Sequence, residues 1–322
     1  LYQFNPIHTI NHKISNKLVR YIGIYVLVVG IYSFFKTYNL LGSRAELLSL
    51  YSATNAWSQV FPLFFSSTCF LLLSNNPKPP ISIYLFAFLP FTFYDFCFQS
   101  RSFLVLSLVS LILALSRRKV NLNRTFVVFF IPFFAILMRL IEIIRSPWLS
   151  YQLSNSPFST LFVLPGEFIN SYFAILLINQ RYQINPFNIL AQNMFFFLPQ
   201  RIRSLFIPDL SVTSDFIDSA SDVISWGLGG NLLVEFFHSS SIIYIYLGPV
   251  FMVIFLVSAK YLYTLNFFSE AFYVICMIYS FKFFRAGFIA SIFECLYYLT
   301  IFIAVYFGYK FIFNSNYSRG ML

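Results

Sequence analysis

Most acidic side chains of this chain fall within one interval, residues 139–241. The interval holds seven of the eleven acids: Glu142, Glu167, Asp209, Asp215, Asp218, Asp222 and Glu235. A carboxylate can act as a general base, and a histidine one helical turn away can pair with it. Glu235 and His238 have this spacing in the segment GLGGNLLVEFFH, so the sequence predicts a candidate base there. A capping or packing role for the same two residues stays open.

Arginines accompany these acids and come from several separate segments. Arg139, Glu142 and Arg145 stand at i, i+3 and i+6, so on a continuing helix the glutamate neighbours both arginines, although an interfacial ion pair would have the same spacing. A guanidinium binds phosphate in a bidentate geometry and stays charged at any working pH, which suits a pyrophosphate. The remaining candidates for such a site are Arg101, Arg201, Arg203 and Arg285.

No motif for a metal, a nucleotide or a nucleophilic serine accompanies these residues. The sequence has no P-loop, no HExxH, no GxSxG and no CxxC pair, and its four cysteines lie in or beside apolar runs without paired spacing. We therefore expect no cofactor and no metal. The net charge of +10 is better explained by loop charges that set membrane topology than by a nucleic-acid partner.

The elements that must position these residues are membrane-spanning helices. Hydrophobic residues make up 59% of the chain and charged residues 10%, which is far from the composition of a soluble domain. Several apolar runs reach the ~20 residues that a helix needs to cross a bilayer, and the alternation of a membrane β-barrel is absent. The sequence thus predicts an all-α, polytopic transmembrane helical bundle of about eight spans. We expect these near residues 18–35, 57–73, 81–98, 102–115, 126–141, 242–262, 271–283 and 288–311.

The predicted spans divide the chain into three parts. These are an N-terminal bundle of five spans at 1–141, a large periplasmic loop at 142–241, and three C-terminal spans at 242–322. Prolines interrupt the apolar segments of the loop, so we expect amphipathic helices that lie on the membrane surface. The chain begins at Leu1 without a signal-like segment, and further helices before this point stay an open alternative.

Basic residues predict the orientation of the bundle, because positive charges resist translocation. With the N-terminus in the cytoplasm, eleven of the 21 basic residues lie inside: Lys13, Lys17, Arg20, Lys78, Arg117, Arg118, Lys119, Arg124, Lys260, Lys310 and Arg319. Against them stand at most Glu270 and Glu294 among the acids. Eight spans also return the C-terminus to the cytoplasm.

Four sequence motifs resemble one family of membrane enzymes. In chain order they are PGEF at 165–168, FFFLPQRIRS at 195–204, GGNLLVEFFHSSSIIYIYLGPV at 229–250 and FFRAGF at 283–288. The order is similar to that of the Wzy-type O-antigen polymerases, also called oligosaccharide repeat-unit polymerases. The Gly-rich turn, the glutamate and the glycine of the next span read Gly229, Gly230, Glu235 and Gly248. FHSSSI departs from the usual aromatic-Gly neighbourhood after the glutamate, and this departure leaves the role of His238 open.

The resemblance implies a metal-independent glycosyltransferase on the periplasmic face of the bacterial inner (cytoplasmic) membrane. A growing glycan on undecaprenyl pyrophosphate is transferred onto a new lipid-linked repeat unit. The arginines named above would include the pyrophosphate clamp, with Arg101 the weaker candidate, and the base would be Glu235, Glu142, Glu167 or His238, in that order. The partners implied are lipid-linked oligosaccharides, membrane lipid and a chain-length regulator. A non-enzymatic flippase for the same lipid-linked oligosaccharide and an O-antigen ligase are the alternatives.

Overall fold

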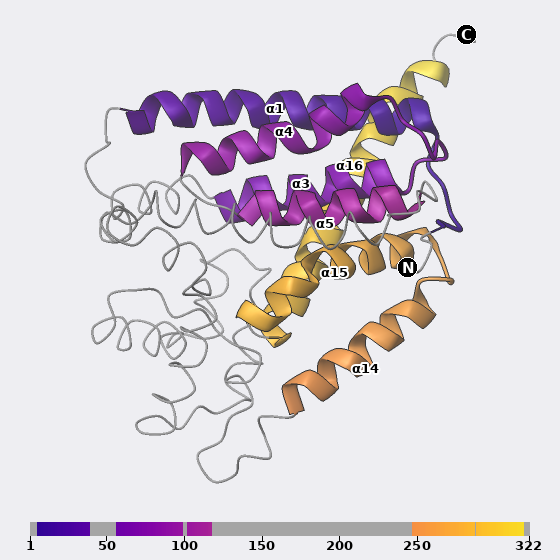
Figure 1. The fold of residues 1–322 in the computed structure, drawn as a ribbon. Coiled ribbons are helices and arrows are strands. Elements are labelled where there is room, and N and C mark those ends of the chain that lie inside the picture. The colour runs from indigo at the N-terminus through magenta and orange to yellow at the C-terminus, as the bar shows by residue number, and fades with distance from the viewer. Residues whose placement is uncertain (1–4, 39–55, 99–101, 118–246, 287, 319–322) are drawn as a thin grey trace, which may run out of the picture. The chain divides into compact units, whose positions relative to one another are not determined.

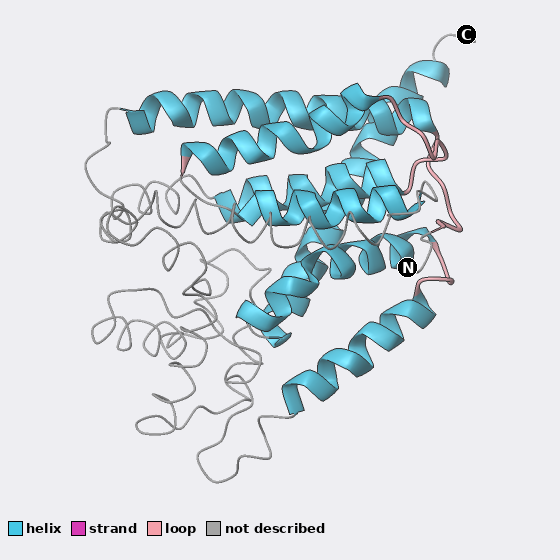
Figure 2. Cartoon of the chain, viewed as in Figure 1, coloured by secondary structure: helices cyan, strands magenta, loops and turns pink. Residues whose placement is uncertain are grey.

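The computed structural model describes residues 5–38, 56–98, 102–117, 247–286 and 288–318. Every regular element in these stretches is a helix (Figure 2), and one isolated bridge pairs Ile10 with Ser74. The expected all-helical class is therefore confirmed for the described part of the chain. The predicted span at 126–141, the predicted loop and both predicted domain boundaries lie outside it and stay predictions.

Seven helices make up the described part of the chain. They are α1 (His12–Tyr38), α3 (Ala56–Leu72), α4 (Ile81–Cys97), α5 (Ser102–Arg117), α14 (Leu247–Leu262), α15 (Phe267–Ala286) and α16 (Phe288–Ser318). Each coincides with one predicted span. By length and composition, two helical segments could cross a membrane, His12–Lys36 and Ser291–Ile312, and the others are shorter apolar helices.

The chain divides into two compact units. In the described residues, the first unit contains α1, α3, α4 and α5, together with α15 up to Ile275 and α16 from Tyr298. The second unit contains α14, α15 from Cys276 and α16 up to Tyr297. Two helices thus contribute one part to each unit.

In chain order, α1, α3, α4 and α5 alternate in direction, whereas α1 and α4, which pack side by side, run in the same direction (Figure 1). The N–H of Ile10 donates to the carbonyl of Leu73 at 2.8 Å, and the N–H of Asn75 donates back to Ile10 at 2.8 Å, so α1 begins where α3 ends. Asp95, near the end of α4, accepts the N–H of Phe103 in the first turn of α5 at 2.7 Å. These contacts confirm an up-and-down arrangement of the four helices.

Two glycines allow α1 to approach α4 closely. A Cβ atom on Gly23 would lie 2.5 Å from the carbonyl oxygen of Phe86, and one on Gly30 would lie 3.1 Å from the ring of Phe93. Their spacing of seven residues places both on the same face of α1. Small residues at helix contacts are typical of membrane bundles, where close backbone approach supplies much of the packing energy.

Phenylalanine rings fill the space between α3, α4 and α5. The ring centroids of Phe61 and Phe103 lie 4.3 Å apart, and Phe64 meets Phe91 edge-on at 5.1 Å. All four side chains are fully buried. Edge-on and tilted contacts of this kind stabilise a core beyond simple burial of area.

The first unit exposes large apolar side chains, and several small polar side chains are buried among its apolar ones. Large apolar side chains form an exposed stripe along α1: Tyr21, Ile24, Tyr25, Val28, Ile31, Tyr32 and Phe35. Small hydroxyl residues are buried instead: Ser15, Ser33, Ser66, Ser67, Thr68, Ser107 and Ser110. Three of these hydroxyls donate to the carbonyl four residues earlier on the same helix, at 2.7–2.9 Å. An exposed apolar stripe over a core of apolar side chains with buried hydroxyls agrees with the predicted membrane association.

Replacing Gly23 tests the close contact between α1 and α4. We expect Gly23→Leu to lower the free energy of unfolding by about 1–3 kcal/mol, because the new side chain must displace the Phe86 carbonyl. Thermal unfolding in detergent measures the change, and Gly23→Ala serves as a milder variant if the leucine protein does not fold. Gly308→Leu is the matched control, since nothing lies within 4 Å of a Cβ atom at that position. Equal melting temperatures for the Gly23 and Gly308 variants would contradict the assignment.

Candidate functional site

The structure places one of the ten residues predicted for the polymerase site. Arg285 lies in α15, two residues before residue 287, at the turn predicted for the outer face. The other nine lie outside the described residues: Arg101, Arg139, Glu142, Arg145, Glu167, Arg201, Arg203, Glu235 and His238. Their mutual geometry stays a prediction.

A buried glutamate ties the N-terminal segment to α15 in the first unit. We call residues 5–11, which precede α1, the strap. One carboxylate oxygen of Glu270 accepts the N–H of Ile7 at 2.6 Å, and the other accepts the N–H of His8 at 2.9 Å. Glu270 itself is fully buried. The sequence had suggested only an inner-face charge here, although an acid directly before an apolar run was a signal of a special role.

A capping box determines where α15 begins. The side-chain oxygen of Asn266 accepts the N–H of Ser269 at 2.8 Å, and the Ser269 hydroxyl accepts the N–H of Asn266 at 3.1 Å. The two residues thereby satisfy each other's unpaired donors at the helix start. This cap sets the direction in which Phe267, Phe268 and Glu270 leave the first turn.

A buried arginine closes the end of α3. The guanidinium of Arg117 donates to the carbonyl of Leu71 at 3.3 Å and also to the carbonyl of Ser74. Carbonyls at a helix C-terminus have no partner within the helix, so a basic side chain there stabilises them. Arg117 and Glu270 also attract each other electrostatically. We call this end of the first unit, with the strap, Arg117 and Glu270, the strap end.

Burial raises the pKa of Glu270 above its ordinary value of 4.5. The bonds from His8 and Ile7 and the positive charge of Arg117 oppose this effect, because they stabilise the carboxylate form. Glu270 lies in the first turn of α15, directly before the span predicted at 271–283. The strap is therefore held by a carboxyl group whose pKa is higher in the folded protein than in the unfolded chain.

A second carboxyl group lies within the helices of the second unit. Glu294, in the second turn of α16, accepts a hydrogen bond from the hydroxyl of Tyr279 in α15. Both residues are a similar number of positions from residue 287, where the two helices meet. Glu294 thus lies seven positions after residue 287, and its assignment to the inner face stays a prediction. Ionisable residues inside apolar helices commonly have a functional or pairing role.

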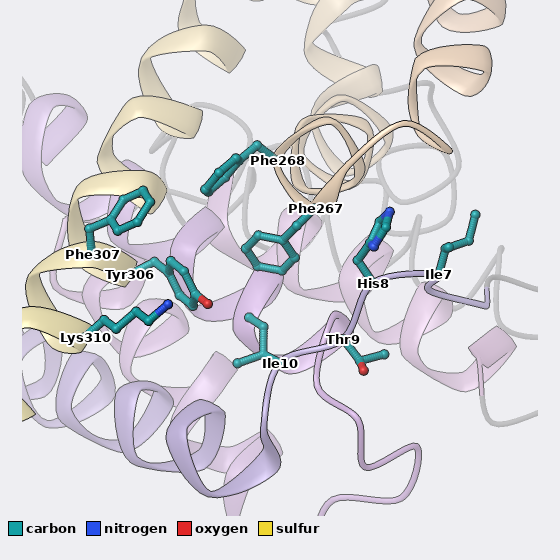
Figure 3. Close-up of a pocket in the computed structure, with 9 residues that line it drawn as sticks. All are labelled: Ile7, His8, Thr9, Ile10, Phe267, Phe268, Tyr306, Phe307 and Lys310. Atoms are coloured by element: carbon teal, nitrogen blue, oxygen red, sulfur yellow. The ribbon is translucent and has the colours of Figure 1, made fainter. Parts of the chain in front are cut away.

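The strap end also contains a pocket of about 500 Å³ (Figure 3). Residues from the strap, α15 and α16 line it: Ile7, His8, Thr9, Ile10, Phe267, Phe268, Tyr306, Phe307 and Lys310. The rings of Phe267 and Tyr306 lie 5.3 Å apart, and those of Phe268 and Phe307 lie 5.8 Å apart. Polar and apolar groups share the exposed wall about equally, and the lining includes one lysine and no carboxylate.

No set of three His, Cys, Asp or Glu side chains is placed to hold a metal ion in the stretches that the structure describes. Comparisons of the chain with protein families, with curated proteins and with solved structures find no match. The family resemblance therefore rests on the sequence motifs alone.

The raised pKa of Glu270 predicts a specific pH dependence of stability. The folded protein binds this proton more tightly than the unfolded chain does. The stability contributed by Glu270 is thus complete below its ordinary pKa of 4.5 and is lost as the pH rises through the raised value. We expect the melting temperature of the wild type to fall relative to Glu270→Gln, which cannot titrate, as the pH rises above 4.5. Asp218→Asn, in the predicted solvated segment, is the control, and parallel curves for wild type and Glu270→Gln would contradict the prediction.

Proposed function

We propose that this chain is a Wzy-type polymerase of bacterial surface polysaccharide, O-antigen or capsule, in the inner membrane. Its substrates would be a glycan on undecaprenyl pyrophosphate and a new lipid-linked repeat unit. The membrane part of the proposal is supported by the exposed apolar stripe along α1 and by the buried hydroxyl residues of the first unit. The enzymatic part is supported by the order of the four motifs in the sequence.

The distribution of charge supports an orientation with the strap end in the cytoplasm. Basic residues at this end come from four places in the chain: Lys13 and Lys17 in α1, Lys78 after α3, Arg117 in α5 and Lys310 in α16. Basic residues are retained on the cytoplasmic side of a membrane. The turn between α4 and α5, which contains Arg101, is then periplasmic.

The proposed reaction needs a cationic clamp and a base. A hydroxyl oxygen of the incoming repeat unit forms a bond to the anomeric carbon of the growing glycan. The bond from that carbon to the pyrophosphate oxygen breaks, and the lipid pyrophosphate leaves with the electron pair. Arginines stabilise the charge that develops on the leaving group, and a carboxylate accepts the hydroxyl proton.

Two other functions would use the same lipid-linked substrates. A flippase would present a polar cavity alternately to both faces of the membrane, whereas a polymerase would stay closed toward the cytoplasm. An O-antigen ligase would transfer the finished glycan to lipid A core and not to a repeat unit. Complementation of a polymerase-deletion strain separates the three, because only a polymerase converts single repeat units into long chains.

Glu235 is the first candidate for the base in that complementation assay. We expect Glu235→Gln to reduce polymerisation by about 10²–10⁴-fold, because an amide cannot accept the hydroxyl proton. Glycan length on a gel and turnover of purified protein with lipid-linked repeat units measure the loss. Asp218→Asn, a matched acid-to-amide change, should keep full activity. If Glu235→Gln also retains full polymerisation, Glu235 is not the base.

Among the clamp candidates, Arg285 has a second basic residue, Lys282, on the same helix that can serve as a control. We expect Arg285→Lys to lower turnover by about tenfold or more, since lysine keeps the charge but loses the two-pronged geometry that fits a phosphate. Lys282→Arg changes the same two residue types in reverse, three positions away, and should leave turnover unchanged. Equal turnover for wild type and Arg285→Lys would remove Arg285 from the clamp.

A further inference from the structure

The pocket at the strap end has both apolar and polar groups in its wall. Its volume of about 500 Å³ falls within the range of small-molecule sites. Phe267 and Phe268 extend from the capped start of α15, Tyr306 and Phe307 face them from α16, and Ile10 lies beneath (Figure 3). These rings and aliphatic groups share the wall with polar groups, and a wall of both kinds fits an amphiphile that has an apolar chain and a polar head.

One unneutralised cation lies at the rim of this pocket. Lys310 is exposed, and the described residues include no ion pair to its ammonium group. Glu270 does not neutralise the charge of Lys310. Both of its carboxylate oxygens accept hydrogen bonds from N–H groups of the strap, and its side chain does not line the pocket. His8 adds a buried ring nitrogen, Nε2, that has no hydrogen-bond partner among the described residues. The polar part of a ligand here would therefore be anionic.

The pocket adjoins exposed apolar surface of the same unit. Phe307 lines the pocket and is 49% exposed, and Phe311 on the next turn of α16 is 80% exposed. Leu265, just before α15, is 66% exposed. In a membrane bundle such side chains face acyl chains, so a chain could pass from the bilayer over Phe307 into the pocket.

We propose that this pocket binds an anionic glycerophospholipid. Its phosphate lies at Lys310 and the Tyr306 hydroxyl, and one acyl chain lies along Phe268 and Phe307. A lysine ammonium attracts phosphate as a point charge, and basic groups beside a membrane select anionic over zwitterionic lipid. With the orientation proposed above, the lipid belongs to the cytoplasmic leaflet. Binding itself requires neither that orientation nor polymerase activity.

Native mass spectrometry of the full-length protein in detergent tests this site directly. The probes are phosphatidylglycerol and phosphatidylcholine with identical acyl chains. We expect the wild type to retain one phosphatidylglycerol about fivefold more tightly than phosphatidylcholine, which is the contribution of one lysine near an anionic head group. Lys310→Gln should remove this preference. Thr9→Trp, which fills the pocket without changing charge, should reduce retention of both lipids at that site.

Lys17→Gln is the matched control for lost charge. Lys17 is exposed at the same end of the unit but does not line the pocket, so this variant should keep the fivefold preference. An equal loss in the Lys17 and Lys310 variants would mean diffuse attraction to the basic surface and would overturn the site. Displacement of phosphatidylglycerol by millimolar glycerol 3-phosphate would also overturn it, because a head group without chains would then suffice. Melting temperatures of all variants show whether each protein is folded.

Discussion

Buried polar groups in the first unit have to find their partners within the chain, because the outer surface of its helices is apolar. Three buried charged residues meet this requirement at helix ends. Asp95 accepts N–H groups at the start of α5, Arg117 donates to carbonyls at the end of α3, and Glu270 accepts N–H groups of the strap. Without water to replace these bonds, an unpaired backbone group in an apolar setting costs several kcal/mol. The positions of the helix ends therefore depend on a few ionic side chains from neighbouring helices.

The same residues connect elements that the apolar packing alone would leave free to slide. Ridges of phenylalanine can interdigitate in more than one register, whereas a guanidinium aligned with two specific carbonyls cannot. The close approach at Gly23 adds a second restriction on the register of α1, since a side chain opposite the Phe86 carbonyl would collide with it. Directional bonds at the ends and a steric match in the middle together define one arrangement of the first four helices.

The positions of the described helices could be predicted well from the sequence, because each of them coincides with an apolar run. Their ends could not, since polar caps lie beyond the apolar run: Asn266 caps α15, which begins at Phe267, four residues before the predicted span. The role of Glu270 could not be predicted for a different reason. Its hydrogen-bond partners, Ile7 and His8, are distant in the sequence, so no local sequence pattern indicates the contact. For the polymerase site, motifs supplied candidates, but the distances between Glu235, the arginines and any substrate stay predictions.

The hydrogen bonds between the strap and Glu270 also affect the order in which the first unit assembles. Ile7 and Glu270 are separated by 263 positions. A ribosome makes the strap first and the glutamate only after the residues between them. Until α15 is present, the strap N–H groups lack this acceptor, and the strap end stays incomplete. Closure of the strap is thus a late assembly step, and it distinguishes a finished first unit from one that still awaits its C-terminal helices.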